Sequence, residues 1–442
     1  MGQQERNAES LLRAWKGDRY AHGVGVLDQV GAYAARFGKR TMLVVTQYGE
    51  EGGKWFGPYL GDITRSLAAN GVDYGEPVKG AGPNAPREDV YRIALAVAKI
   101  RPDSIIAVGG GSTIDAGKAA SVLVSYQGSD IEPYFGVGQV TEVSRAQGNP
   151  MIPVIAVQTA ASSGAHLTKY SNITDPAKGI KKLIVDEAII PAAAVFDYRV
   201  TQGAPISLTL DGGLDGIAHC WEVFIGATGK AYYQEIREIT ETSIRLIAAN
   251  LPRAMADPND LDARVALGLG TDLGGYAIMI GKVNARTGQM ERGGTNAGHL
   301  GSFQLTPYLA HGRACAVLNP YYVVLFADAI EPQNRTVGAI FQEAGFIAGN
   351  VNLGELGGRG LAEVVAEGMI AFSRIVGFPT TLEEAGVPEA HIAVMVEAAK
   401  NPQLKMKLQN MPSPMDVERG DVDRLMRPTL EAAYRGDLSL IP

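Results

Sequence analysis

Residues 211–222 read D-G-G-L-D-G-I-A-H-C-W-E, and residues 298–312 read G-H-L-G-S-F-Q-L-T-P-Y-L-A-H-G. In a helix, Asp215 and His219 of the first segment lie four residues apart on one face. The second segment adds two imidazoles, those of His299 and His311. One carboxylate and three neutral nitrogens make a mixed ligand set, which suits Zn²⁺ or Fe²⁺ better than Ca²⁺ or Mg²⁺. The two segments therefore predict a metal site.

The same spacing has a simpler interpretation that stays open at this point. An isolated Asp-x-x-x-His pair in a helix is more often an ordinary surface or N-terminal feature than a pair of ligands. The chain holds six histidines, however, and two of them fall within one short glycine-rich segment. That concentration favours the metal site. Cys220 follows His219 but points in another helical direction, and we expect it to be a small buried filler.

The composition limits the class of protein. A chain of 442 residues exceeds the usual size of one hydrophobic core, so two domains are expected. Its net charge of −7 provides no broad basic field, which argues against nucleic-acid binding. Two cysteines are too few for a disulfide framework. A polar N-terminus without a signal peptide and the lack of an apolar run of about 18 residues predict a cytoplasmic protein without a membrane span.

The N-terminal half alternates short apolar runs with helical patterns. The run T-M-L-V-V-T at 41–46 is rich in β-branched residues, as are S-I-I-A-V at 104–108 and I-P-V-I-A-V-Q-T at 152–159. Such runs are typical of buried parallel strands. We also expect a weaker strand at 72–78, a last strand at 193–197, a turn at His22 beside two glycines, and a loop from the helix after 111 through Pro150. The pattern predicts an α/β domain with a mostly parallel sheet.

Two of these strands lead into segments suited to a ligand. The strand at 104–108 continues into G-G-G-S-T-I-D-A-G-K, where glycines let backbone N–H groups approach an anion at a helix N-terminus. This pattern predicts a phosphate cradle, with a tight strand-to-helix turn as the alternative. The strand at 152–159 ends in T-A-A-S-S-G-A-H-L-T-K-Y, which places hydroxyl groups at the carboxyl edge of the sheet, where open α/β sheets bind ligands.

From about residue 206 the pattern is helical, and no strand alternation interrupts it. We therefore predict an α/β nucleotide-binding domain at residues 1–205 and an all-α metal-binding domain at residues 206–442. The helices are expected at 209–226, 231–250, 259–281, 313–327, 332–345, 359–376, 388–400 and 420–435.

These motifs together, in this order from about residue 20 to about residue 435, resemble the iron-containing alcohol dehydrogenases. The resemblance implies a Rossmann-like N-terminal domain and a helical metal-binding domain, a two-domain plan related to that of dehydroquinate synthases. It implies that a dinucleotide meets Gly109, Gly110, Gly111, Ser112 and Asp115, with Thr159, Ser163, Thr168 and Lys181 nearby. It implies that Asp215, His219, His299 and His311 hold the metal.

The family resemblance also implies the reaction. The protein is expected to be an NAD- or NADP-linked oxidoreductase that moves a hydride between a small alcohol and the nicotinamide, with Fe²⁺ or Zn²⁺ polarising the substrate oxygen. The reverse direction reduces an aldehyde. Glu222, one turn beyond His219, is expected to orient that imidazole or else to be a solvated carboxylate. A homodimer or higher homo-oligomer is expected, because soluble enzymes of this kind are often symmetric homo-oligomers.

Three positions depart from the family pattern. Gln47 stands where many NAD-using members carry an acidic residue that repels a 2′-phosphate, which predicts weak discrimination between NAD and NADP or a preference for NADP. His166 stands near a position that is usually acidic, and it is expected either to take part near the nicotinamide or to be satisfied by the backbone. Phe303 replaces a histidine that many members carry one turn after the first, so no proton relay is expected there.

Three rival interpretations remain from the sequence. Maleylacetate reductases share the fold but typically lack a complete set of metal ligands. Dehydroquinate synthase-like cyclases use a related plan with more basic residues for an acidic substrate. A non-catalytic dinucleotide-binding protein would bind the cofactor without metal and without turnover. Metal content separates the last and the first of these from a metal-dependent dehydrogenase.

Overall fold

The computed structural model describes residues 2–50, 55–162, 164–177 and 179–442 and divides the chain into two compact units. The α/β unit comprises Leu12–Pro205 and Asn259–Gly268. The helical unit comprises Met1–Leu11, Ile206–Pro258 and Leu269–Pro442. The chain thus passes from the α/β unit to the helical unit at 205/206. Two short segments lie outside this simple division: residues 1–11 belong to the helical unit, and residues 259–268 belong to the α/β unit.

The α/β unit is built on a parallel sheet, as predicted. Its strands run in the order β1-β10-β7-β5-β2-β3, and β4 also pairs with β2. Every pairing in this sheet is parallel. The central strands are buried along nearly their whole length, as expected for β-branched runs covered on both faces. The strands span Tyr20–Gly23 (β1), Arg40–Val45 (β2), Asp73–Tyr74 (β3), Val78–Lys79 (β4), Ser104–Gly109 (β5), Val154–Gln158 (β7) and Ala193–Asp197 (β10).

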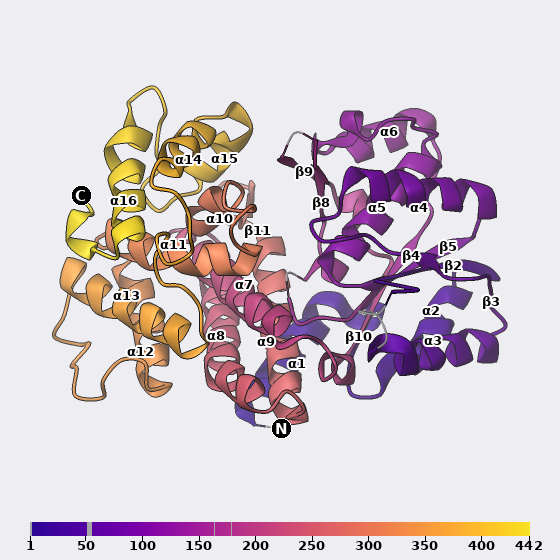
Figure 1. Ribbon diagram of the computed structural model, residues 1–442, viewed down its shortest axis with the longest axis horizontal. Coiled ribbons are helices and arrows are strands. Elements are labelled where there is room, and N and C mark those ends of the chain that lie inside the picture. The colour runs from indigo at the N-terminus through magenta and orange to yellow at the C-terminus, as the bar shows by residue number, and fades with distance from the viewer. Residues whose placement is uncertain (1, 51–54, 163, 178) are drawn as a thin grey trace. The chain divides into compact units, whose positions relative to one another are not determined.

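Helices cover both faces of this sheet. Figure 1 shows α4 and α5 on one face and α2 and α3 on the other. Apolar side chains of the sheet and of α4 and α5 form one continuous core that includes Val44, Ile105, Ile93 and Ile114. The helices span Gln29–Ala35 (α2), Gly57–Ala69 (α3), Arg87–Ile100 (α4) and Gly111–Ser125 (α5).

Several elements of the α/β unit differ from the sequence prediction. His22 lies in β1, which pairs with β10, and not in a turn. The weak strand expected at 72–78 is two short strands, and the expected loop before Pro150 contains helix α6, Gln139–Gln147. An unpredicted hairpin follows residue 169: β8, Tyr170–Asp175, pairs antiparallel with β9, Ile180–Val185, and β6, Gly136–Val137, joins β9.

The helical unit matches the predicted series of long helices, with small additions. A two-stranded antiparallel ribbon of Gly281–Val283 (β11) and Met290–Arg292 (β12) interrupts what was predicted to be all-α. The short helices α10, Ala297–Ser302, and α15, Lys405–Gln409, were also not predicted. The remaining helices span Gln3–Lys16 (α1), Ile206–Ile225 (α7), Tyr233–Ala256 (α8), Leu261–Met279 (α9), His311–Leu325 (α11), Glu331–Glu343 (α12), Gly358–Ile375 (α13), His391–Ala399 (α14) and Arg427–Arg435 (α16).

Helix α7 packs against α8 and α11 in the helical unit, and its glycines allow the close approach of α8. A glycine inside a helix costs about 1 kcal/mol relative to alanine. A Cβ at Gly213 would lie 2.9 Å from Leu251 Cδ1 of α8, and one at Gly216 would lie 3.0 Å from Ile247 Cδ1 of the same helix. These glycines therefore allow α8 to pack closely against the helix that carries Asp215 and His219.

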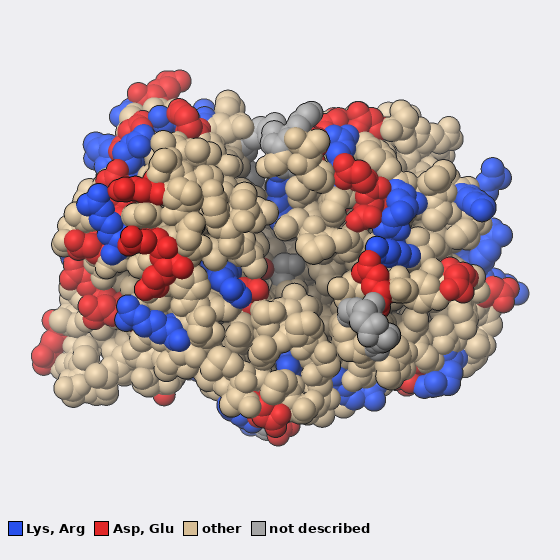
Figure 2. Space-filling model, in the orientation of Figure 1, with Lys and Arg blue, Asp and Glu red and all other residues tan. Residues whose placement is uncertain are grey.

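On the face drawn in Figure 2, basic and acidic side chains are interspersed over each unit. Among the described helices, none combines the length and the apolar character needed to cross a membrane.

Candidate metal centre

Three histidines converge on one carboxylate oxygen in the helical unit. Asp215 Oδ1 lies 3.7 Å from His219 Nε2, 3.8 Å from His299 Nε2 and 3.7 Å from His311 Nε2. Asp215 and His219 come from α7, His299 from α10, and His311 is the first residue of α11. The structure thus brings together all four residues predicted as metal ligands.

These spacings fit a metal ion better than direct hydrogen bonds. Hydrogen bonds join heavy atoms at about 2.7–3.2 Å, whereas ligand atoms about 2.1 Å from a tetrahedral zinc ion lie roughly 3.4 Å from one another. Within the described part of the chain, Asp215 Oδ1 is buried and accepts no hydrogen bond. An oxygen buried in this way is costly unless a cation satisfies it. The residues present therefore fit a divalent iron or zinc ion.

The charge of the centre is set by Asp215. Burial works to raise the pKa of its carboxyl group, but the three neighbouring imidazoles outweigh burial and lower that pKa below its usual value. The carboxylate is thus kept ionised in a site where its side chain is only 6% exposed. His311 is the most accessible ligand, with 31% of its side chain exposed.

Glu222 orients one of the imidazoles, although not the one expected. Its Oε1 lies 2.8 Å from His299 Nδ1, and the backbone N–H groups of Asn296 and His299 and the Nδ2 of Asn319 also donate to the carboxylate. Glu222 is fully buried, so the alternative of a solvated carboxylate is wrong. The expectation that it orients His219 is also wrong, because α10 presents His299 to it. Holding Nδ1 of His299 leaves Nε2 facing Asp215.

Two cysteines lie in the helical unit, and one of them borders the site. Cys315 Sγ lies 3.6 Å from His299 Nδ1, and with Asp215, His299 and His311 it forms a group whose ligand atoms all lie within 4.8 Å of one another. Metal binding requires the thiolate. Burial, together with the charges of Glu222 and Asp215, raises the pKa of Cys315 well above its usual value. Its Sγ lies beside Nδ1 of His299, whereas His219 Nε2 faces Asp215 Oδ1 together with Nε2 of His299 and of His311, so His219 is the better fourth ligand. Cys220 is fully buried, as expected, and burial raises its pKa to about 12.

The residues predicted to bind the dinucleotide gather at one edge of the parallel sheet. The register sets Val45 beside Val108, and Gly109 beside Gln158. The segments that follow these strands therefore lie at the same carboxyl edge, and they contain Gln47, Gly109 to Ser112, and Thr159. A Cβ at Gly109 would lie 2.7 Å from Thr113 Cβ, so the close turn into α5 requires a glycine there.

The other residues predicted near the dinucleotide do not lie directly after the strands of the parallel sheet. Asp115 is buried in α5, where its Oδ2 accepts from the backbone N–H of Asn172 at 2.9 Å and its Oδ1 lies 3.5 Å from Lys118 Nζ. Thr168 follows the short helical turn Ala165–Leu167, and Lys181 lies in β9. Ser163 lies outside the described residues. His166 is 1% exposed, and its Nε2 lies 3.2 Å from Tyr20 Oη beside the ring of Phe196.

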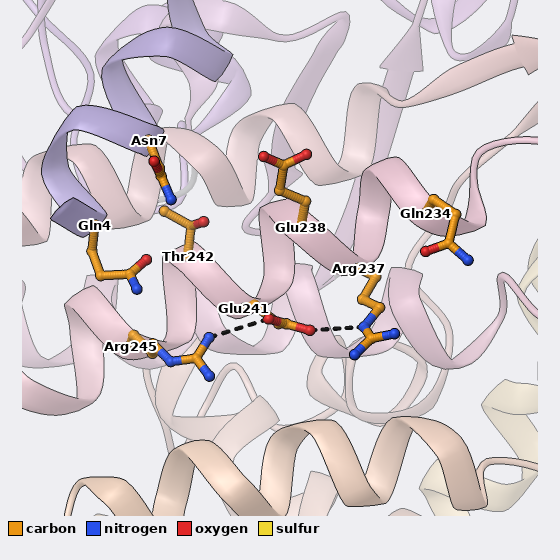
Figure 3. A pocket seen from close by; sticks show the side chains of 8 residues that line it. All are labelled: Gln4, Asn7, Gln234, Arg237, Glu238, Glu241, Thr242 and Arg245. Carbon is orange, nitrogen blue, oxygen red and sulfur yellow. Dashed lines mark hydrogen bonds and ion pairs between the residues drawn. The ribbon is translucent and has the colours of Figure 1, made fainter.

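The helical unit also contains a polar surface hollow that none of the predicted ligands lines. It has a volume of about 430 Å³ and lies between α1 and α8 (Figure 3). Arg237 and Arg245 both donate to Glu241 along one side of α8. Since its arginine charges are paired and no predicted ligand borders it, we do not assign the metal chemistry to this hollow.

Family models match both units of the chain. Residues 17–198 match the model described as iron-containing alcohol dehydrogenase, and residues 209–428 match the C-terminal model of the Fe-containing alcohol dehydrogenase family. The chain belongs to the iron-containing alcohol dehydrogenases. It is therefore an oxidoreductase, a metal-dependent alcohol dehydrogenase linked to a nicotinamide dinucleotide.

Named relatives agree with this family. The chain is 26% identical over 382 residues to the NAD-dependent methanol dehydrogenase of Bacillus methanolicus, covering 85% of this chain and 90% of the relative. It is 29% identical over 325 residues to the 1,3-propanediol dehydrogenase of Klebsiella pneumoniae, covering 72% and 75%. The solved alcohol dehydrogenase from Oenococcus oeni superposes with a TM-score of 0.76 at 25% identity, covering 94% of this chain and 98% of that one.

Within this iron-containing alcohol dehydrogenase, we expect Glu222→Gln to weaken metal binding and turnover about 10- to 100-fold. The amide keeps the size of the side chain but cannot accept from every donor that now faces Glu222, so His299 loses its fixed orientation. The measurements are the dissociation constant of the metal and kcat/KM. Glu238→Gln on α8 is the matched control, because Glu238 is exposed. Equal metal affinity in the two variants would contradict the role of Glu222.

Proposed function

We propose that Asp215, His219, His299 and His311 bind one Fe²⁺ or Zn²⁺ ion, and that the carboxyl edge of the parallel sheet binds NAD or NADP. The convergence of three imidazole nitrogens on the buried Asp215 Oδ1 carries this proposal. It favours a metal-dependent dehydrogenase over a metal-free reductase or a non-catalytic binding protein, since neither of those needs such a set. The division of labour between a dinucleotide-binding region, 1–205, and a metal-binding region, 206–442, is part of the same proposal.

The residues of the chain divide the work as follows. When bound, the metal supplies Lewis acidity toward an alcohol or carbonyl oxygen, and the nicotinamide supplies the hydride chemistry. Asp215 contributes the negative charge of the ligand set. Glu222 fixes the ring of His299, and the start of α11 fixes His311. The glycine turn at 109–111 lets backbone N–H groups approach the pyrophosphate, where the N-terminus of α5 favours negative charge.

The substrate class is proposed to be a small alcohol and its aldehyde. The names of the two relatives above describe dehydrogenases of methanol and of 1,3-propanediol, both short alcohols. A cytoplasmic homodimer or higher homo-oligomer is proposed with it, and the two free, buried cysteines suit a reducing compartment.

The test is metal content and turnover of the same preparation. Protein purified without added metal should contain about one Fe or Zn per chain, or take it up under anaerobic conditions with Fe²⁺, and should then oxidise short alcohols. Protein that neither holds nor takes up metal, yet reduces a substrate with NADH or NADPH, would replace the proposal by a metal-free reductase. Cofactor binding without any turnover of the metal-loaded protein would point to a binding protein.

Cofactor preference gives a separate prediction at Gln47. We expect the wild type to discriminate weakly between NAD and NADP or to favour NADP, because Gln47 carries no charge to repel a 2′-phosphate. Gln47→Asp should shift the ratio of kcat/KM by about tenfold toward NAD, the effect of one interaction worth roughly 1.4 kcal/mol. The ratio is measured with both cofactors at one ionic strength. A strong wild-type preference for NAD would contradict the prediction.

A further inference from the structure

Two lysines hold the backbone of segment 165–170 in the α/β unit. Lys118 of α5 places its Nζ 2.6, 3.1 and 2.8 Å from the backbone oxygens of Ala165, Thr168 and Tyr170, respectively. Lys16, the last residue of α1, donates to the backbone oxygen of Leu167 at 2.7 Å. Four carbonyl groups of this one segment therefore accept from two ammonium groups.

The two lysines are both needed because of the number of donors that each carries. An ammonium group has three N–H donors, and Lys118, which is fully buried, directs three hydrogen bonds to this segment. Leu167 is also buried, and a buried carbonyl group without a partner is costly. The carbonyl group of Leu167 is left to Lys16.

Lys16 is kept beside segment 165–170 by the strand that follows it. Tyr20, the first residue of β1, places its Oη 3.2 Å from His166 Nε2, and the centres of the two rings lie 5.3 Å apart. Strand β1 belongs to the parallel sheet through its pairing with β10. The match to the family model begins at residue 17, so the helix that carries Lys16 precedes the matched residues.

Segment 165–170 packs against the helix whose N-terminus is proposed to face the pyrophosphate. That helix, α5, begins at Gly111, and Lys118 lies seven residues later, about 10 Å along the axis at 1.5 Å per residue. Between them, Asp115 Oδ2 accepts from the backbone N–H of Asn172 at 2.9 Å. The chain from the segment to Asn172 thus runs beside the first turns of α5, and its path shapes the surroundings of the proposed cofactor site.

We propose that Lys16 is a positioning residue for the dinucleotide: together with Lys118, it holds segment 165–170 in the conformation that binds the cofactor. This inference rests on the proposed function, because Thr168 of this segment is among the residues expected near the dinucleotide. Lys16 acts through the backbone of Leu167. Without its ammonium group the segment gains conformational freedom, which cofactor binding must then remove at a cost in affinity.

The charge of Lys16 sets the conditions of the test. Burial lowers the pKa of this lysine to about 8, the charges of Arg19 and Lys118 act in the same direction, and Glu187 opposes them. At pH 7 most of the side chain is therefore protonated. Its hydrogen bond to Leu167 is then charge-assisted, which makes it stronger than a bond between neutral groups.

The test is the dissociation constant of NADH and of NADPH, measured on the full chain at pH 7 by fluorescence titration. Lys16→Met should weaken binding of the tighter of the two about tenfold, the lower end of what the loss of a hydrogen bond to a charged group costs. Methionine keeps the apolar stem and loses the donor. Arg13→Met is the matched control, because Arg13 is an exposed cation in the last turn of the same helix. It should bind as the wild type does.

Steady-state kinetics and hydrogen exchange separate positioning from a purely structural role. In Lys16→Met the KM for the dinucleotide should rise, while the KM for a short alcohol stays unchanged. Amide exchange in segment 165–170 should be faster than in Arg13→Met, and saturating NADH should reduce the difference. Equal dissociation constants or equal exchange in the two variants would overturn the role of Lys16 and leave the dehydrogenase intact. A wild type that binds neither dinucleotide would overturn the proposed function, and this inference with it.

Discussion

Asp215→Asn should release the metal and lower kcat/KM about 1,000-fold. The three histidine nitrogens converge on Oδ1 of this residue, at 3.7 to 3.8 Å, and no other carboxylate belongs to the proposed ligand set. A divalent metal contributes several kcal/mol of charge stabilisation, and about 4 kcal/mol corresponds to 1,000-fold at 1.36 kcal/mol per factor of ten. The measurements are metal per chain by elemental analysis and kcat/KM with a short alcohol.

Asp211→Asn supplies the control for that variant. Asp211 lies one turn earlier on α7, and its Oδ1 lies 3.0 Å from Arg313 Nε rather than among the histidines. The substitution therefore removes a carboxylate from the same helix without removing a proposed ligand, and the metal should remain. One metal per chain in Asp215→Asn, with turnover within about tenfold of the wild type, would remove Asp215 from the ligand set.

The sequence predicted the parallel sheet because its central strands are buried on both faces and so read as apolar runs. The prediction from sequence failed where a strand forms because it pairs with a neighbouring strand distant in the sequence. His22 was predicted in a turn because Gly23 and Gly25 lie beside it, yet His22 belongs to β1, which is held by pairing with β10 at the edge of the sheet. Gly23 has a φ of +135°, and β1 ends at this glycine. In the hairpin, β8 alternates buried and half-exposed residues over only six positions, too few to separate it from a loop by period alone.

The candidate metal site was likewise predicted in part from the sequence and in part not. Spacing within one helix placed Asp215 and His219 on one face, and the short glycine-rich segment at 298–312 supplied His299 and His311. Spacing within α7 also suggested that Glu222 serves His219, but the packing of α10 against α7 presents His299 instead. Contacts between distant segments, such as Lys407 with Thr295 across 112 residues, leave no periodic signal in the sequence. Local chemistry could therefore be predicted, and the partner of each buried group could not.

Gly312→Ala is expected to displace His311 from the proposed metal centre. A Cβ at this position would lie 2.0 Å from the backbone oxygen of Asp211 and 2.9 Å from Cβ of Asp215, so α11 would have to move away from α7. Because His311 is the preceding residue, the movement would carry a proposed ligand with it. Overpacking of this kind costs about 1–3 kcal/mol of stability, and a displacement of about 1 Å at a catalytic site can cost on the order of 100-fold in turnover.

The measurements for Gly312→Ala are the rate of metal loss to a chelator, kcat/KM and the free energy of unfolding. Gly360→Ala is the matched control, because Gly360 lies in α13 with no atom within 4 Å of the position of its added Cβ. That variant should keep its metal and gain up to about 1 kcal/mol of stability from the better helix propensity of alanine. If Gly312→Ala retained metal and turnover as well as Gly360→Ala does, the close contact between α7 and α11 would not be what positions His311. Faster metal loss in Gly312→Ala alone would instead mean that a backbone contact on α7, outside the ligand set, holds the metal centre together.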